Sequence, residues 1–355
     1  MAAPRRLAPT YARARLEFLA AADAAGARIA THPHPGRGLE GEDLAVDVAE
    51  LGPADAADVV LVVSATHGVE GYCGSALQTG WLERPTRSRP EGVRLVLVHA
   101  LNPHGFSWVR RVNEDNVDLN RNFVDWSQPP PENPDYDRIA HLLVPPSWTP
   151  EEQERTTLEL VGIAEEMGLE RMQEVVSRGQ YRQPTGVFYG GSGPVWSNRW
   201  LHTWCESELG ACRRLTIVDL HSGLGPWGHG ELICVESAGT APHDRARALW
   251  GEVTSMADGS AAGATLDGDW LTGAHQLARH AETTGGALEF GTVDPVTVAQ
   301  ALRADAWLHA HGDPLGPAGE EVRAQVRAAF ADDDPAWIDV LWTRFTEVLG
   351  AALAR

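Results

Sequence analysis

The chain has 355 residues, a formal net charge of −20 at pH 7, 43% hydrophobic residues and 22% charged residues. This composition is that of a globular protein with a sizeable core. The strong acidity disfavours nucleic acid or an anionic membrane as a partner, although a local arginine cluster can still hold an anionic substrate. The length fits one large domain or two ordinary ones.

Cysteine usage and hydropathy favour a cytoplasmic protein. The four cysteines lack the paired spacing of a zinc ribbon or a disulfide framework, which favours a reducing compartment. No apolar core follows the N-terminal arginines, so we expect no signal peptide, and no apolar run is long enough for a membrane span. The sequence is compatible with a homo-oligomer but does not specify one.

In the first third of the chain, the hydrophobic pattern predicts helices and buried strands. Tyr11 to Gly26 has apolar residues at helical spacing and ends at a glycine, as amphipathic helices do. Short β-branched runs between polar segments predict strands that are buried on both faces. The other elements expected here are strands at Leu44–Leu51, Val59–Val63 and Val93–His99, and a helix at Gly74–Leu82.

Prolines are dense from Asp125 to Pro150, so we expect an irregular excursion there. A charged helix is expected to follow from Pro150 to about Gly179, because proline and acidic residues favour a first helical turn. Another helix is expected from Trp196 to Leu209. We interpret Asp125 to Asn198 as an insertion in the domain.

The last part of the chain again alternates strands with helices, which indicates a mostly parallel sheet with helices on both faces. We therefore predict one α/β domain over residues 1–355, with a mostly parallel mixed sheet. The elements expected here are strands at Leu215–Leu220, Glu231–Val235 and Ala287–Phe290, and helices at Pro242–Asp258, Val296–His309, Gly319–Phe330 and Pro335–Leu353.

The strand Val59–Val63 leads into His67-Gly68-Val69-Glu70-Gly71. In open α/β sheets, binding and catalysis occur beyond the carboxyl ends of the strands, which is where His67 and Glu70 are expected. A short His-x-x-Glu motif also arises by chance, so its value depends on partners elsewhere. Cys73 follows closely as either a further ligand or a small packing residue, and we favour packing.

His221 is the best candidate for a third ligand, because it too follows a buried strand and enters a glycine-containing loop. Two histidines and one glutamate, with a position left open, form one of the ligand sets of hydrolytic zinc sites. The alternative is an ordinary surface histidine. Asp219, two residues earlier, either orients a ligand or helps to hold the loop.

Glu289 is a lone carboxylate between Leu288 and Phe290 in an apolar strand. Burial would raise its pKa and a nearby zinc ion would lower it, so the sequence does not settle the balance. A zinc hydrolase needs a base to deprotonate water, and we favour that role for Glu289 over an edge-strand acid facing water.

Arginines cluster at Arg110-Arg111-Val112-Asn113 and in the segment Val117 to Phe123. They could form a solvated face. A guanidinium group, however, matches a carboxylate bidentately, and a neighbouring asparagine adds a donor. Another arginine can stabilise the oxyanion that develops when water attacks a carbonyl. The sequence therefore contains candidates for metal, base, oxyanion and carboxylate sites.

Together these segments resemble the zinc carboxypeptidase superfamily, in which HxxE, an RxN…DLNRNF segment, a strand-end histidine and a late glutamate occur in this order. The resemblance covers about Leu44 to Thr292. The forms HGVEG, DLHSGLG and LEFGT, with GQYRQPTGVFYGG between them, resemble a bacterial branch of little-characterised carboxypeptidase-like proteins. Aspartoacylase and succinylglutamate desuccinylase are related to the same core.

The resemblance implies a zinc carboxypeptidase-like fold, one zinc ion per chain and a role for each matching residue. His67, Glu70 and His221 match the zinc ligands of the superfamily. Glu289 matches the general base, and Arg111 matches the arginine that stabilises the oxyanion. Asn120 and Arg121 match the pair that holds the terminal carboxylate of the substrate. Arg110 is a further candidate for substrate binding, and the sequence leaves open which of Arg110 and Arg111 faces the oxyanion.

Two features depart from the superfamily pattern. Secreted carboxypeptidases have a mobile tyrosine shortly before the general base, whereas no tyrosine follows Tyr189 here. Tyr189 is the candidate substitute in substrate binding. The insertion from Asp125 to Asn198 exceeds what the peptidase core needs, and we expect it to cover the active-site cleft.

The sequence therefore predicts a zinc-dependent hydrolase that cleaves an amide or peptide bond next to a free carboxylate in a small molecule or short peptide. The alternative is a specialised amidase of the aspartoacylase type that deacylates N-acyl amino acids. A third hypothesis is a zinc- or carboxylate-binding protein without activity. Glu289 argues against it, because binding alone does not need a base.

Overall fold

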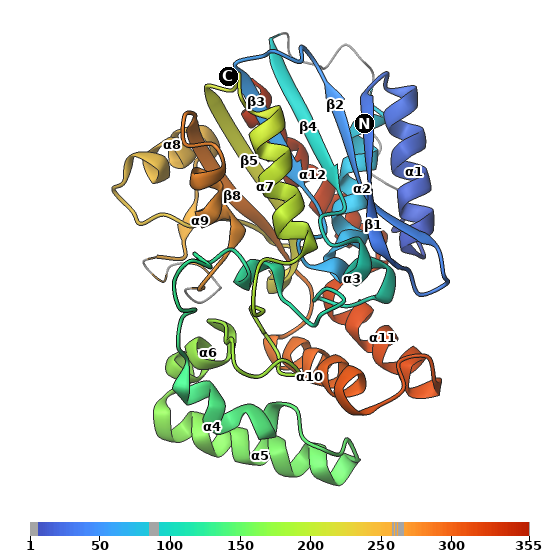
Figure 1. Ribbon diagram of the computed structural model, residues 1–355, viewed down its shortest axis with the longest axis vertical. Coiled ribbons are helices and arrows are strands. Elements are labelled where there is room, and N and C mark those ends of the chain that lie inside the picture. The colour runs from blue at the N-terminus through green and yellow to red at the C-terminus, as the bar shows by residue number, and fades with distance from the viewer. Residues whose placement is uncertain (1–5, 85–91, 258, 260, 262–265, 355) are drawn as a thin grey trace.

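The computed structural model describes residues 6–84, 92–257, 259, 261 and 266–354. Within these residues the strands form one eight-stranded mixed sheet with the order β1-β2-β4-β3-β5-β8-β6-β7. This arrangement confirms the predicted α/β class (Figure 1). The strands are β1 (Arg28–Arg37), β2 (Asp43–Leu51), β3 (Asp58–Val63), β4 (Val93–His99), β5 (Arg214–Trp227), β6 (Gly230–Cys234), β7 (Thr254–Ser255) and β8 (Glu282–Gly291).

The centre of the sheet consists of the parallel strands β4, β3, β5 and β8. β1 and β2 join it antiparallel on one side, and β6 pairs antiparallel with β8 on the other. Because the central strands are parallel, their carboxyl ends meet at one edge of the sheet. His67 follows β3, and His221 and Glu289 belong to the neighbouring strands β5 and β8, so all three residues lie at that edge.

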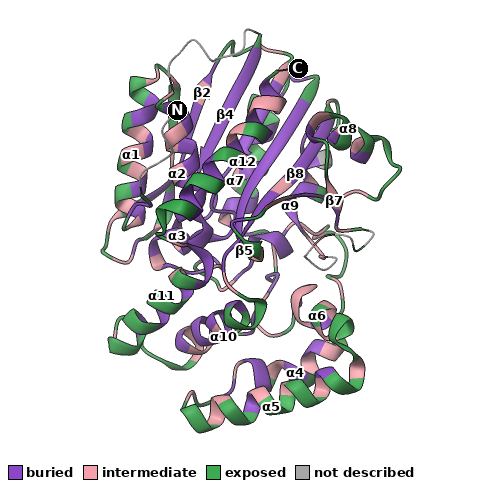
Figure 2. Cartoon of the chain, turned by 180° about the vertical axis from the view of Figure 1, so that it is seen from behind, coloured by how far each residue is buried: buried purple, intermediate pink, exposed green. Residues whose placement is uncertain are grey.

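Alternate residues of β3 pack into two different hydrophobic clusters, as the period of a strand requires. Val60 and Val62 face α1 (Tyr11–Ala24), α2 (Gly71–Leu82) and α12 (Pro335–Leu353). Val59, Leu61 and Val63 face α7 (Trp196–Glu208) and α9 (Trp270–Leu277). The sheet is thus covered on both faces, and Figure 2 shows the inner strands β4, β5 and β8 as continuously buried over most of their length.

The elements near the carboxyl edge of the sheet are short helices and the returning C-terminal helices. The 3₁₀ turns η1 (Gly68–Glu70) and η3 (Leu119–Arg121) carry candidate site residues. The remaining helices outside the insertion are α3 (Pro103–Trp108), α8 (Ala241–Trp250), α10 (Pro295–His311) and α11 (Pro317–Phe330).

The predicted insertion contains three helices beyond the carboxyl edge of the sheet: α4 (Pro134–Leu143), α5 (Pro150–Met167) and α6 (Leu169–Ser177) (Figure 1). Arg303 of α10 holds this extension by donating to the carbonyl oxygens of Leu142 and Leu143 at 2.8 and 3.1 Å. The last residues of the predicted insertion, 196–198, form the first turn of α7.

The expectation of an irregular Asp125–Pro150 stretch was wrong for α4. Pro134 occupies the first turn, the side chain of Asn133 accepts from the main-chain N–H of Tyr136, and acidic residues follow in the first turn. These features favour a helix start. The single helix expected from Pro150 to Gly179 is interrupted at Gly168, whose φ of +90° is a conformation that glycine adopts readily.

Sequence patterns also missed β1 and α9. β1 contains Pro33 and Pro35 and forms an edge of the sheet, where missing N–H groups are tolerated. The helix expected to end at Asp258 ends at Trp250, and Asp258 itself lies outside the described residues. Cys73 is buried in the hydrophobic core, in agreement with its interpretation as a packing residue.

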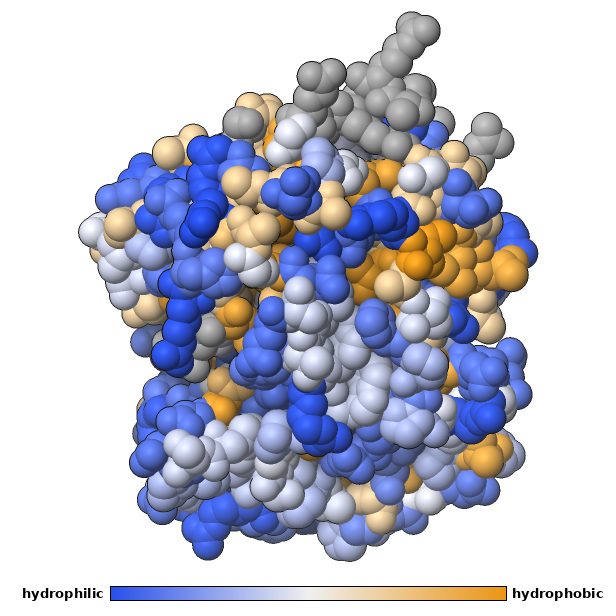
Figure 3. Space-filling view, turned by 45° about the horizontal axis from the view of Figure 1, so that its top comes forward, coloured by the Kyte–Doolittle hydropathy of each residue, from blue (hydrophilic) through white to orange (hydrophobic). Residues whose placement is uncertain are grey.

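The surface seen in Figure 3 is largely hydrophilic, with hydrophobic residues gathered in limited patches, in keeping with the net charge of −20. Over the part of the chain that the structure describes, no helix combines the length and apolar character needed to cross a bilayer.

Asn122 joins the segment just before the predicted insertion to the last part of that insertion, ahead of α7. It is fully buried, its Nδ2 donates to the carbonyl oxygens of Gly190 and Gly193 at 2.8 and 2.9 Å, and its Oδ1 accepts from the N–H of Val195 at 3.0 Å. One side chain thus satisfies three main-chain groups that precede α7.

We predict that Asn122→Ala lowers the free energy of unfolding by about 2–4 kcal/mol, because the variant leaves buried main-chain groups unsatisfied. Urea unfolding measures the loss. The control is Ser127→Ala, at an exposed turn, for which a change within about 0.5 kcal/mol is expected. Equal stability of the two variants would contradict this role of Asn122.

Candidate metal centre

The loop that carries His67 and Glu70 is tightly bound to the arginine segment. The main-chain N–H groups of Gly68 and Val69 donate to the carbonyl oxygens of Arg111 and Arg110 at 3.0 and 2.8 Å. A Cβ atom on Gly68 would lie 2.1 Å from the main-chain carbonyl carbon of Gly105, so only glycine permits this approach. The sequence therefore fixes His67 and Glu70 against the segment that supplies the arginines.

Three side chains at the carboxyl edge of the sheet converge on one point. His67, Glu70 and His221 are at most 4% exposed, and one ligand atom from each lies within 4.8 Å of the others. Glu70 Oε2 is 2.9 Å from His221 Nδ1. Two imidazoles and a carboxylate are a donor set suited to zinc, so these residues fit a metal ion and can hold one.

His221 is oriented by Asp219. The Nε2 atom of His221 donates to Asp219 Oδ2 at 2.5 Å, which turns Nδ1 toward Glu70. Thr66 and Trp270 also donate to this carboxylate, at 2.8 and 2.6 Å. Burial opposes protonation of His221, but Asp219 and Glu70 outweigh it and raise the pKa of the imidazole well above its usual value.

His67 lies between a guanidinium group and a carboxylate. Arg111 Nη2 is 2.7 Å from His67 Nε2, and Asp118 Oδ1 is 3.4 Å from His67 Nδ1. A guanidinium group only donates, so Nε2 is the unprotonated nitrogen and accepts from Arg111, while Nδ1 carries the proton and faces Asp118. Burial and the charge of Arg111 lower the pKa of His67 well below its usual value, which keeps the imidazole neutral as ligation requires.

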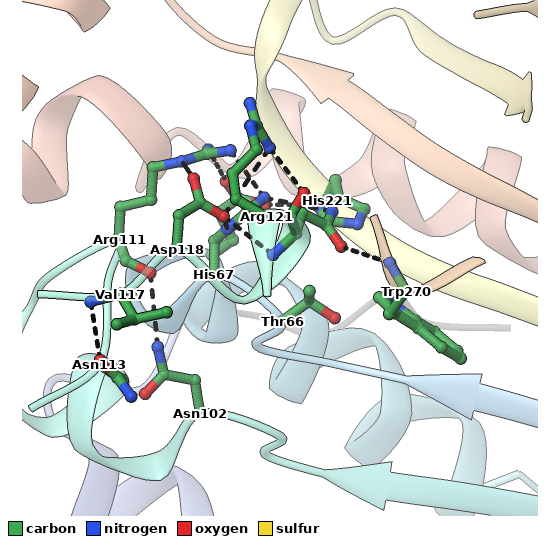
Figure 4. Close-up of polar contacts among 12 residues, drawn as sticks. Thr66, His67, Asn102, Arg111, Asn113, Val117, Asp118, Arg121, His221 and Trp270 are labelled. Atoms are coloured by element: carbon green, nitrogen blue, oxygen red, sulfur yellow. Dashed lines mark hydrogen bonds and ion pairs between the residues drawn. The ribbon is translucent and has the colours of Figure 1, made fainter. Parts of the chain in front are cut away.

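Arg111 links the predicted metal ligands to Asp118 (Figure 4). It donates to Glu70 Oε1 at 3.1 Å and to Asp118 Oδ2 at 2.9 Å. Burial would raise the pKa of Asp118, but Arg111 and His67 hold it well below its usual range. Asp118 therefore stays ionised and anchors both Arg111 and the His67 side of the site.

Glu289 pairs with His221 in the register of β8 and β5, so both side chains point to the same face of the sheet. Its Oε1 accepts from the N–H of Leu224 at 3.0 Å, and the residue is 9% exposed. Burial and the negative charge of Glu70 raise the pKa of Glu289 to about 7. A metal cation nearby would favour the ionised form, so the carboxyl group is suited to exchanging a proton near neutral pH.

Asn120 and Arg121 have different neighbours: Asn120 lies beside His67, whereas Arg121 contacts the end of α6. Asn120 Nδ2 is 3.5 Å from His67 Nε2, beside the metal ligands. Arg121 is 2% exposed and donates through Nε and Nη2 to the carbonyl oxygen of Ser177, at the end of α6, at 2.9 and 2.5 Å. The insertion thus contacts the very arginine that sequence reasoning assigns to the substrate carboxylate.

The side chains of Arg110 and Tyr189 do not contact the candidate metal ligands His67, Glu70 and His221. Arg110 Nε is 3.1 and 3.0 Å from the two oxygens of Asp305, and Nη2 donates to Asn116 at 2.8 Å. Of the two neighbouring arginines, it is therefore Arg111 that contacts candidate metal ligands, namely His67 and Glu70. Tyr189 is buried in the hydrophobic cluster of the α7 face, and its main-chain carbonyl accepts from the N–H of Asp118. Their predicted roles in substrate binding stay predictions.

Sequence reasoning missed three side chains that complete the site. Asp118 was visible only as part of the DLNRNF segment, and Trp270 begins a helix that was not predicted. Phe188 packs against both arginines, with Arg111 Cζ 5.4 Å and Arg121 Cζ 5.1 Å from its ring centroid. An acidic N-cap at Asp269 was the one sequence signal for the helix of Trp270.

Comparison with known proteins gives one family match and a set of similar structures. The family model described as "Protein of unknown function (DUF2817)" matches residues 7–344. A search of curated proteins found no match. Among solved structures, bovine thrombin-activatable fibrinolysis inhibitor, in complex with tick carboxypeptidase inhibitor, has 9% identity and a TM-score of 0.51, covering 99% of this chain and 97% of that one.

Two further structures have lower TM-scores. Carboxypeptidase A from Helicoverpa armigera has 12% identity and a TM-score of 0.49, covering 92% of this chain and 75% of that one. Succinylglutamate desuccinylase from Chromobacterium violaceum has 16% identity and a TM-score of 0.39, covering 87% and 76%. The match to the bovine structure, at a TM-score of 0.51 and 9% identity, confirms the predicted carboxypeptidase-like resemblance at the level of the fold alone.

Proposed function

We propose that this chain, which belongs to the family described as "Protein of unknown function (DUF2817)", is a zinc-dependent hydrolase that cleaves an amide bond next to a free carboxylate. The observation that carries the proposal is the buried group of His67, Glu70 and His221. A proton acceptor and a guanidinium group lie beside it. Among the described residues, no other group of histidines, cysteines and carboxylates is placed to hold a metal ion.

In this proposal His67, Glu70 and His221 hold one zinc ion per chain. A zinc ion at such a site supplies Lewis acidity, which polarises a carbonyl group and lowers the pKa of water. The surrounding protein keeps the ligands ready: Asp219 fixes the ring of His221, and burial together with the charge of Arg111 lowers the pKa of His67 and keeps its imidazole neutral. These contacts support the ligand set because Asp219 holds Nε2 of His221 and leaves Nδ1 facing Glu70, while Asp118 lies beside Nδ1 of His67 and leaves Nε2 as the unprotonated nitrogen.

Glu289 is the proposed general base. It removes a proton from the attacking water and returns that proton to the leaving amine, so the C–O bond forms and the C–N bond breaks without a net change of charge. The pKa of about 7, raised by burial and by Glu70, supports this exchange near neutral pH. The N–H of Leu224 holds one oxygen of Glu289 in place.

Arg111 is the proposed group that stabilises the negative charge on the carbonyl oxygen as water attacks. Its guanidinium group is held by Asp118 and lies next to Glu70 and His67, so it is oriented before the substrate arrives. Donors that need no reorganisation during the reaction are effective in stabilising such a charge. Asn120 and Arg121 are the proposed partners of the substrate carboxylate.

A small substrate fits the contacts of Arg121 better than a long peptide. Ser177 of α6 accepts from this guanidinium group, and a Cβ on Gly179 would lie 2.8 Å from Arg121 Cδ. A substrate carboxylate therefore reaches Arg121 by taking the place of the Ser177 carbonyl, beneath the insertion. This crowding favours an N-acyl amino acid or a dipeptide and makes deacylation of N-acyl amino acids the second candidate reaction.

The four cysteines support a cytoplasmic location in this proposal. All four are buried and free, and burial raises the pKa of the thiols of Cys205 and Cys212 to about 12 and about 11. Buried thiols of this kind are stable packing groups in a reducing compartment.

We expect the zinc-loaded protein to hydrolyse N-acyl amino acids or dipeptides, and Glu289→Gln to lower kcat by about 10²- to 10⁴-fold, because an amide cannot accept the proton of water. Zinc binding is expected to persist in the variant. Steady-state kinetics and metal analysis of the same samples measure both effects.

Glu282→Gln is the matched control, because Glu282 is an exposed glutamate at the other end of the same strand. Its kinetics should equal those of the wild type. Near-normal turnover of Glu289→Gln would remove Glu289 from the mechanism, whereas a loss of zinc would show that Glu289 acts on the metal rather than on the proton.

The insertion predicts a dependence on substrate length. In a series of peptides that end in one preferred residue, kcat/KM should fall beyond two or three residues. Converting the terminal carboxylate to an amide should cost about 1.5–3 kcal/mol of binding, the value of a hydrogen bond to a charged group. Equal kcat/KM along the series would instead indicate an open carboxypeptidase cleft.

A further inference from the structure

Trp270 connects two parts of the candidate site that are distant in sequence. It is the first residue of α9 and is fully buried. Its indole Nε1 donates to Asp219 Oδ2 at 2.6 Å, and its main-chain N–H donates to Asn120 Oδ1 at 3.4 Å. Figure 4 shows the indole directed toward the group of polar side chains around His221. One residue thus contacts both the β5 side and the η3 side of the site.

The contact with Asp219 matters because of what this carboxylate does for His221. Oδ2 of Asp219 accepts from both Trp270 Nε1 and His221 Nε2, at 2.6 and 2.5 Å. An indole nitrogen can only donate a hydrogen bond, so its bond to Asp219 has one possible direction and fixes the position of Oδ2. Thr66 fixes the other oxygen at 2.8 Å. The carboxylate can then rotate little, and the imidazole ring follows it.

The second contact concerns Asn120. Because its Oδ1 accepts from the main-chain N–H of Trp270, its amide nitrogen is turned toward His67 Nε2, at 3.5 Å. The start of α9 therefore limits the side chain of Asn120 as well as that of Asp219.

The position of Trp270 is itself built into the chain. Gly268 has a φ of +82°, and a Cβ there would lie 2.6 Å from the carbonyl oxygen of Arg121, so glycine is required for this approach. The N–H of Phe123 donates to the carbonyl oxygen of Gly268 at 2.9 Å. Asp269 caps the helix by accepting from the N–H of Thr272 at 2.9 Å. These contacts place the indole before any ligand is bound.

We propose that Trp270 is a positioning residue for the metal centre: its indole N–H fixes Asp219 and thereby the ring of His221. The inference rests on the proposed function, because it assumes that His221 is a metal ligand. It goes beyond that function because it makes the affinity of the site for zinc depend on a residue that is not a metal ligand. Partners of this kind typically change metal affinity by about 10- to 100-fold when they are lost.

The test is the variant Trp270→Phe, which keeps an aromatic ring in the core and removes only the N–H donor. Metal-free protein is titrated with zinc in competition with a chromophoric chelator. We expect zinc to bind about 10- to 100-fold more weakly than to the wild type. Circular dichroism establishes that the metal-free variant is folded under the conditions of the titration.

Trp250→Phe is the matched control. Trp250 is 9% exposed and its indole N–H donates to the carbonyl oxygen of Val348 at 3.1 Å, in contact with α12 rather than with the site. It should lose a comparable amount of stability with no change in zinc affinity. If the loss of an indole N–H acted only through general structure, both variants would lose zinc affinity to the same extent. That result would overturn the inference.

A double-mutant cycle with Asp219→Asn separates a direct route through Asp219 from any other. Asp219→Asn alone should weaken zinc binding, and adding Trp270→Phe should then cost little more. Full additivity of the two effects would overturn the inference. If Trp270→Phe does not fold, Asp219→Asn tests the same bond from the acceptor side, and unchanged zinc affinity in it would again overturn the inference.

Failure of this inference differs from failure of the proposed function. Tight zinc binding in both the wild type and Trp270→Phe would overturn the positioning role and leave the metal centre intact. Absence of zinc binding in the wild type would overturn the metal centre, and the positioning role with it.

Discussion

The burial of negative charge at the carboxyl edge of the sheet is the constraint on which the site depends. Glu70, Asp118 and Asp219 are at most 1% exposed, and a carboxylate removed from water is costly unless charges or donors surround it. Arg111 is the guanidinium group that contacts two of them directly, at 3.1 and 2.9 Å. The ligand atoms of His67, Glu70 and His221 that converge at this edge suit a metal ion.

The same requirement explains why the site draws on so much of the chain. Each carboxylate has its own donors: Ser222 for Glu70, the N–H of Asn120 for Asp118, and Thr66 for Asp219. These donors come from β5, η3 and the end of β3, which the parallel core brings to one edge. Each element thus completes the hydrogen bonding of another, and the predicted insertion contacts the site through Ser177 and Phe188.

The features that could be predicted from the sequence are those that local residue patterns determine, whereas contacts between distant residues could not be predicted. The β-branched run Val59–Val63 and the residues that follow it are local patterns, so His67 and Glu70 were predictable at a strand end, as were His221 and Glu289. Asp118, Phe188 and Trp270 are defined by distant partners instead. Trp270 meets Asp219 across 51 positions, and no hydrophobic period reveals such a contact. The helix α4 was missed because proline was interpreted as a breaker when it began a helix.

Locating the metal tests the central claim most directly. Crystals of the zinc-loaded wild type, measured above and below the zinc absorption edge, should show one anomalous peak per chain between His67, Glu70 and His221. The peak should be absent from His221→Ala crystals and present in those of His243→Ala, a buried histidine of α8 outside the site. A zinc peak elsewhere in the wild type, or an unchanged peak in His221→Ala, would contradict the account.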